Sequence, residues 1–289
     1  MKFDSYHPAI NFIFFISVLF FSFYFTQPVF IAISFFAALI YSIKCGKTKA
    51  VVLDVVLILF ALIYTLYYSY YNHFGVTNLM VNIIGNQITL ESVFMGFVRG
   101  IHIATAAMWF YCMTKVISTD KIIYMTGRVS PKLSLFISIT LRSVPQFVQR
   151  FRTVNRAQCS IGRGFNQGNI FVRIKNSFRV LSIVITQTLE SFVEISNSMK
   201  SRGYSLKGRT AFSVYRFDNR DRSVVILMFF GLIVTFMGIA LNQGKMQINP
   251  EIILNPITSI SYLIYFIYFL FSVLPVILEM IADYKSQYK

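Results

Sequence analysis

Six long apolar runs constrain the fold of this chain more than any other feature of its sequence. A membrane-spanning helix needs about 20 mainly apolar residues, and irregular backbone cannot face lipid, so each run is expected to be a helix. The runs cover residues 9–26, 28–43, 51–71, 93–116, 223–241 and 257–281. The sequence therefore predicts an all-α, polytopic integral membrane protein with about six transmembrane helices.

The overall composition agrees with a membrane protein. Hydrophobic residues make up 56% of the chain and charged residues only 13%, whereas a soluble domain carries about 25% charged residues. The first apolar run is followed by no small-residue cleavage site, so it is expected to be a membrane helix rather than a signal peptide.

The basic residues lie in one block of the sequence. Residues 115–222 hold 19 of the 27 Lys and Arg residues and five acids, whereas residues 71–92 hold no Lys or Arg. The positive-inside rule places the first stretch in the cytoplasm and the second outside. An even number of spans then puts both termini in the cytoplasm. This placement accounts for the net charge of +16 without nucleic-acid binding.

The chain is therefore expected to have three segments. Residues 1–117 would form an N-terminal membrane domain of four spans, residues 118–222 a cytoplasmic coupling region, and residues 223–289 a pair of C-terminal spans. Within the middle segment, the apolar stretch 133–151 is predicted to lie along or dip into the membrane surface and to bend at Pro145, because proline breaks a helical hydrogen bond. A seventh span there would invert the charge rule.

Two long amphipathic helices are predicted to follow in this cytoplasmic region. Apolar residues recur at helical spacing in both, and arginines are interleaved in the first. The apolar positions are Phe147, Phe151 and Val154 in the first helix, and Ile185, Leu189, Phe192, Ile195 and Met199 in the second. Periodicity alone favours basic helices that rest on anionic lipid headgroups.

Both helices are predicted to end in a small residue, an arginine and a glycine. The two motifs are Gly162-Arg163-Gly164 and Ser201-Arg202-Gly203, and an aromatic residue follows each. Glycine after the last turn is a common helix stop, and arginine suits the negative end of the helix dipole. A projecting arginine between small residues also fits an acidic groove, where a guanidinium grips a carboxylate with two hydrogen bonds.

At these two motifs the sequence resembles the transmembrane T component of energy-coupling factor (ECF) transporters, the CbiQ family. The hallmark of that family is a pair of short arginine motifs, usually Ala-Arg-Gly, at the tips of two coupling helices. Gly162 and Ser201 stand where the family usually has alanine, and Lys200 replaces an expected acid. Further similar positions are His7-Pro8, Thr89-Leu90-Glu91-Ser92, Leu141-Arg142-Ser143-Val144-Pro145, Arg156-Ala157-Gln158 and Glu194.

The resemblance implies a subunit that couples ATP hydrolysis to the import of vitamins or transition-metal ions across a bacterial cell membrane. Its partners would be two ABC ATPases and a small membrane S component that binds the substrate. Arg163 and Arg202 would dock on the ATPases, and the chain itself would carry no catalytic residue, metal or cofactor. The S component would contact the side chains of Phe147, Phe151, Val154, Ile185, Leu189, Phe192 and Met199.

Three other functions fit parts of the sequence. A membrane-embedded transferase needs clustered carboxylates for magnesium, and Asp218-Asn219-Arg220-Asp221 has the right spacing but no second carboxylate pair. A stand-alone secondary transporter usually shows internal repeats, and no clear repeat relates the two halves of this chain. A membrane anchor that binds anionic lipid or nucleic acid through its basic block explains the charge but not the paired arginine motifs.

Overall fold

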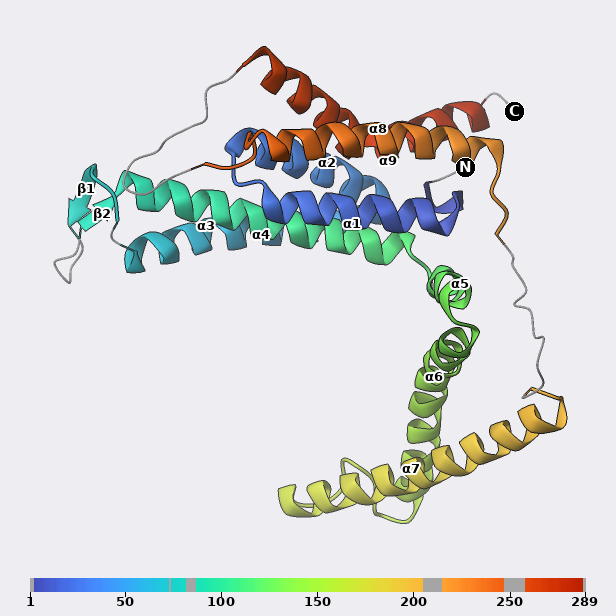
Figure 1. The fold of residues 1–289 in the computed structure, drawn as a ribbon. Coiled ribbons are helices and arrows are strands. Elements are labelled where there is room, and N and C mark those ends of the chain that lie inside the picture. Colours follow the sequence, from blue (N-terminus) through green and yellow to red (C-terminus); the bar gives the residue numbers. More distant parts are fainter. Residues whose placement is uncertain (1–2, 73, 82–86, 205–214, 247–257, 288–289) are drawn as a thin grey trace. The chain divides into compact units, whose positions relative to one another are not determined.

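The computed structural model describes residues 3–72, 74–81, 87–204, 215–246 and 258–287, and these residues are almost entirely helical (Figure 1). The helices are η1 (Phe3–Ser5), α1 (Pro8–Tyr24), α2 (Pro28–Gly46), α3 (Thr48–Tyr71), α4 (Leu90–Val116), α5 (Thr119–Val129), α6 (Pro131–Ser160), α7 (Ile170–Ser201), α8 (Asn219–Ala240) and α9 (Ser259–Gln287). The two strands are β1 (Asn78–Val81) and β2 (Gln87–Thr89).

The chain folds as two compact units. Unit 1 comprises Met1–Ser118 and Tyr215–Lys289, and unit 2 comprises Thr119–Val214. The two predicted membrane segments, 1–117 and 223–289, therefore lie in one unit, because α9 packs against α2 and α8 packs against α1 and α9. Unit 2 covers most of the predicted coupling region.

Unit 1 carries the membrane-spanning helices. Five of its helices, α2, α3, α4, α8 and α9, are long and apolar enough to cross a membrane, and α1 is apolar but has 17 residues. They run alongside one another in Figure 1. These helices confirm the predicted multi-pass membrane fold. Neither α6 nor α7 is among the candidate spans, so the alternative of a seventh span has no support from the structure.

Aromatic side chains fill the interior of unit 1. Trp109 of α4 is fully buried, and its Nε1 donates a hydrogen bond to Ser34 Oγ of α2 at 3.0 Å. The rings of Phe14, Phe15 and Tyr41 lie 5.9–6.4 Å from the Trp109 ring, measured between centroids. Because lipid tails are as apolar as these side chains, the helices are held together mainly by close packing and buried hydrogen bonds.

Glycines allow α3 and α4 to approach closely. A Cβ at Gly100 would lie 2.6 Å from the Ala61 carbonyl oxygen, and a Cβ at Gly96 would lie 3.0 Å from the Thr65 carbonyl oxygen. In both places the obstacle is backbone, which a rotamer change cannot remove.

Gly100→Ala is therefore expected to destabilise unit 1 by about 1–3 kcal/mol, the usual effect of overpacking. Gly231→Ala is the matched control, because the atoms nearest its added Cβ would belong to the Phe271 side chain, with Cδ2 at 2.9 Å, and not to backbone. Thermal unfolding in detergent should show a larger drop in melting temperature for Gly100→Ala. An equal drop for both variants would contradict the backbone contact.

A small β-hairpin before α4 was not predicted from the sequence. β1 and β2 pair antiparallel in the loop between α3 and α4. Glu91, in the first turn of α4, accepts hydrogen bonds from the backbone N–H of Val76 and Thr77 and from the Thr77 hydroxyl. Thr89 caps the same helix by accepting from the Ser92 N–H at 3.3 Å. These bonds give Thr89 and Glu91 a structural role at the start of α4.

Unit 2 consists of α5 and the crossing pair α6 and α7. The apolar stretch 133–151 and the first amphipathic helix, predicted as separate elements, form the single helix α6 (Figure 1). Val154 of α6 packs with Val180 and Val184 of α7 in a buried cluster. Arg150 fastens the same crossing, since its guanidinium donates to the Gln187 carbonyl at 3.1 Å and to Ser191 Oγ at 2.8 Å.

Candidate functional site

The candidate site lies in unit 2, where α6 and α7 each end near an arginine flanked by small residues. At the first tip, the Gly162 N–H donates to the Cys159 carbonyl at 3.1 Å and the Arg163 N–H donates to the Gln158 carbonyl at 2.9 Å. This pair of bonds is the Schellman motif, and Gly162 has the left-handed φ of +73° that the motif favours. The first tip therefore presents Arg163 just beyond the helix stop.

The second tip, at the end of α7, uses the same backbone motif. The Gly203 N–H donates to the Lys200 carbonyl at 3.0 Å, and the Tyr204 N–H donates to the Met199 carbonyl at 3.1 Å. Gly203 has a φ of +75°. Arg202 is the residue immediately before this left-handed glycine, at the C-cap of α7.

The two tips therefore differ in register. The left-handed glycine precedes Arg163 but follows Arg202. Ser201 is the last residue of α7, whereas Gly162 lies beyond the end of α6. The prediction that the glycine after each arginine stops the helix holds for the second tip and is wrong for the first. The Arg163 side chain therefore starts one residue after the left-handed glycine, and the Arg202 side chain one residue before it.

Both arginine side chains are available to a partner. Arg163 and Arg202 are exposed, and among the described residues no carboxylate lies within salt-bridge distance of either guanidinium.

Gly164, the second glycine of the first tip, is required for a steric reason. It is buried against α6, and an added Cβ would clash with Cys159 Sγ and lie 3.1 Å from Cys159 Cα. By contrast, a Cβ at Gly162 would meet nothing within 4 Å. Gly164 therefore allows close packing, whereas Gly162 allows the left-handed turn.

This distinction predicts how Gly162 responds to substitution. A β-branched residue in the left-handed region is strained by about 1–2 kcal/mol, whereas asparagine tolerates it. Gly162→Val should therefore speed hydrogen exchange of the Arg163 amide roughly 5- to 30-fold, and Gly162→Asn should change it little. Mass spectrometry of the peptide that contains Arg163 would measure both, and equal exchange in the two variants would contradict the assigned turn.

An apolar groove separates α6 and α7 on one side of their crossing. It has a volume of about 680 Å³. Its lining comes from the first two-thirds of α6 and the C-terminal half of α7: Phe136, Ile139, Thr140, Ser143, Val144, Phe147, Val148, Thr188, Phe192, Ile195, Ser196 and Met199. The groove is thus a continuous apolar surface of the size that holds part of a partner.

The structure brings only some of the predicted contact residues to this groove. Phe147, Phe192 and Met199 line it. Ile185 and Leu189 are exposed on α7 but lie outside it.

Two predicted contact residues lie instead at the helix crossing. Val154 is 8% exposed, and Phe151 packs against the cluster that Val154 forms with α7. Val154 is thus buried at the crossing, whereas Phe151 packs against the cluster and stays partly exposed. The contact between α6 and α7 could not be predicted from the sequence, because periodicity describes the faces of one helix and does not say which helix packs against them.

A family comparison decides how this site is classified. The sequence model of the CbiQ family, described as cobalt transport protein, matches residues 6–212 of this chain. The chain belongs to the CbiQ family. The match covers the first four membrane helices and both arginine tips.

Similar proteins carry a more specific name. The chain is 32% identical over 99 residues to the energy-coupling factor transporter transmembrane protein EcfT of Bacillus selenitireducens, which covers 34% of this chain and 37% of that protein. It is 34% identical over 104 residues to EcfT of Lactobacillus helveticus, covering 36% and 37%. EcfT of Ruminiclostridium cellulolyticum is 27% identical over 142 residues, covering 47% and 51%. The chain thus aligns with about a third to a half of the length of these relatives.

Further positions that resemble the CbiQ family have structural roles here. His7 caps α1, because its side-chain Nδ1 accepts the Ala9 N–H at 3.2 Å. The backbone N–H of His7 donates to Asp221 Oδ1 at 3.4 Å. Asp221 also accepts the Asp218 N–H at 3.1 Å, within a capping box that begins α8. The two carboxylates are thus engaged by backbone groups at a helix start, which argues against the diphosphate site of a transferase.

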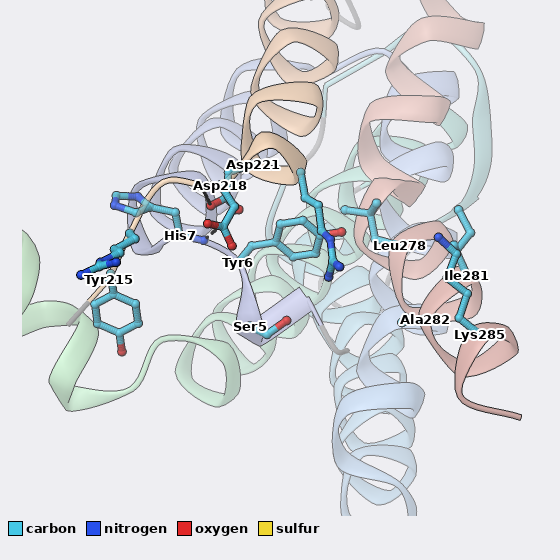
Figure 2. A pocket seen from close by; sticks show the side chains of 12 residues that line it. Ser5, Tyr6, His7, Tyr215, Asp218, Asp221, Leu278, Ile281, Ala282 and Lys285 are labelled. Carbon is cyan, nitrogen blue, oxygen red and sulfur yellow. Dashed lines mark hydrogen bonds between the residues drawn. The ribbon is translucent and has the colours of Figure 1, made fainter. Parts of the chain in front are cut away.

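These residues border a cavity of about 540 Å³ in unit 1 (Figure 2). Tyr6, His7, Asp218 and Asp221 gather on one side of the view, and the end of α9 supplies Leu278, Ile281, Ala282 and Lys285 on the other. Burial, together with the negative charge of Asp221, raises the pKa of Tyr6 above its ordinary value.

Proposed function

We propose that this chain is the energy-coupling transmembrane subunit of an ECF-type ABC importer for vitamins or transition-metal ions. Its partners are two ABC ATPase subunits, a substrate-binding S component and the lipid bilayer. ATP is hydrolysed in the ATPases, and this chain transmits their motion to the S component.

The observation that carries the proposal is the pair of exposed arginines on one crossing helix pair. Arg163 and Arg202 each project beside a Schellman motif, and the apolar groove opens between the same two helices. A guanidinium at a helix end suits an acidic groove of an ATPase. The groove suits an apolar helix of the S component, with Phe147, Phe192 and Met199 as contacts. Ile185 and Leu189 extend this contact along α7.

The mechanism follows from the rigidity of the two helices. ATP binding closes the ATPase dimer and moves the docked arginines toward each other. The Val154 cluster and Arg150 hold α6 and α7 together at their crossing. The Arg202 tip ends the half of α7 that lines the groove, so displacement of the two tips about the crossing changes the shape of the groove. The S component is thereby reoriented. Pro145 lies inside α6 beside the groove-lining Val144, and we propose it as the bend that permits this change.

Orientation follows from charge. The excess of Lys and Arg in unit 2 supports our proposal that this unit lies in the cytoplasm, with both termini on the same side of a bacterial cell membrane. Docking on cytoplasmic ATPases requires this orientation.

The test is copurification. The chain would be co-expressed with a pair of ABC ATPases and a small membrane S component from the same host, and extracted in mild detergent. Recovery of all four subunits in one complex is expected. Failure to recover any ABC ATPase would overturn the proposal and favour a lipid-bound role for α6 and α7, whose exposed apolar residues are interleaved with basic ones.

A further inference from the structure

Three amide side chains hold the backbone that carries Arg163. Asn155 Oδ1 accepts the Phe165 N–H at 3.0 Å. Gln167 Oε1 accepts the Gly164 N–H at 2.9 Å, and its Nε2 donates to the Cys159 carbonyl at 3.3 Å.

The third amide comes from the other helix. Asn176 of α7 is 4% exposed, and its Nδ2 donates to the Gly164 carbonyl at 3.4 Å and to the Gln167 carbonyl at 3.5 Å. We refer to Asn155, Gln167 and Asn176 as the amide clamp. The clamp joins the loop between α6 and α7 to both helices.

The clamp fixes the backbone next to the docking side chain while leaving that side chain free. The Arg163 N–H is engaged by the end of α6, and the N–H groups of Gly164 and Phe165 are engaged by Gln167 and Asn155. Three successive amides are thus bonded, whereas the Arg163 side chain is exposed. Docking then orders one side chain rather than a whole loop, which favours binding.

We propose that Asn155, Gln167 and Asn176 are positioning residues that preorganise Arg163 for docking on an acidic groove of a partner protein. This inference rests on the proposed function, because it assigns the clamp a purpose at the first docking tip. The clamp acts through Arg163 and makes no contact with the partner.

The first arm of the test uses this chain alone. Asn155→Leu removes the acceptor, so hydrogen exchange of the Phe165 amide should become about five- to tenfold faster, as expected for one lost hydrogen bond. Asn155→Asp keeps an acceptor and should restore slow exchange. Gln149→Leu, on the exposed face of the same helix, is the control and should leave exchange unchanged. Unchanged exchange in Asn155→Leu would overturn the clamp whether or not any ATPase binds.

The second arm measures affinity for the ATPase pair. Asn155→Leu should weaken binding about fivefold or more in the wild-type background, and it should have no further effect in an Arg163→Ala background, because residues that act through one another are not additive. An equal loss in both backgrounds would overturn the positioning role. If the wild-type chain binds no ATPase, the proposed function fails, whereas the exchange data still decide whether the clamp exists.

Discussion

Reversing the charge of both tip arginines, as Arg163→Glu with Arg202→Glu, is expected to abolish copurification with the ATPases. Breaking a desolvated arginine–carboxylate pair weakens binding by about 2–5 kcal/mol, which corresponds to roughly 30- to 4,000-fold in affinity. Reversal also adds repulsion between like charges. Two such losses in one complex exceed what the remaining contacts of the tips can offset.

The double reversal should leave the fold of the chain intact. Both side chains are exposed, and within the described residues neither takes part in a salt bridge. The backbone bonds of both Schellman motifs involve no side-chain charge. The melting temperature of the variant in detergent should therefore match that of the wild type.

The matched control is Arg152→Glu with Arg156→Glu. These two arginines are exposed on α6, and their reversal changes the net charge by the same amount. Because interactions between exposed charges are screened by salt, this control should reduce ATPase binding only weakly at physiological ionic strength. ATPase binding that survives reversal of the tips, or that is lost equally in the control, would remove the assigned role of the two tips.

The sequence predicted the parts of this fold that depend on local chemistry. Apolar runs of sufficient length located the membrane helices, and the two Arg-Gly motifs located both tips. The register of the first tip could not be predicted, because Gly162 and Gly164 flank Arg163 and either could end the helix. The structure places the left-handed turn at Gly162, where an added Cβ would meet nothing, and packs Gly164 against Cys159. That packing exists only in three dimensions.

The groove and the clamp were missed for a related reason. On α6, Phe136, Ile139 and Phe147 lie on one face at helical spacing, with Ser143 between them, which is the signal of a mainly apolar face. From the sequence, the stretch 133–151 is expected along the membrane surface, because periodicity does not distinguish lipid from a second helix. The clamp residue Asn176 carries no local signal, since its partners lie in the preceding loop.

The groove yields the second large prediction, which concerns the S component. Phe192→Glu places a carboxylate in the apolar lining, where it must be desolvated or must hold water against the partner. Loss of a central aromatic contact weakens association by 2 kcal/mol or more, about 30-fold in affinity. The S component should therefore be lost from the complex, whereas the ATPases should remain, because the tips are unchanged.

Val193→Glu is the control that separates the groove from the helix as a whole. Val193 is the next residue on α7, is 61% exposed and does not line the groove. Val193→Glu introduces the same charge at the neighbouring position of α7, so any general effect on the helix should be shared by both variants. Retention of the S component by Phe192→Glu, or equal loss with Val193→Glu, would contradict the groove as its docking surface. Loss of the ATPases together with the S component would mean that the groove and the tips form one cooperative structure, since a local charge at Phe192 contacts neither arginine.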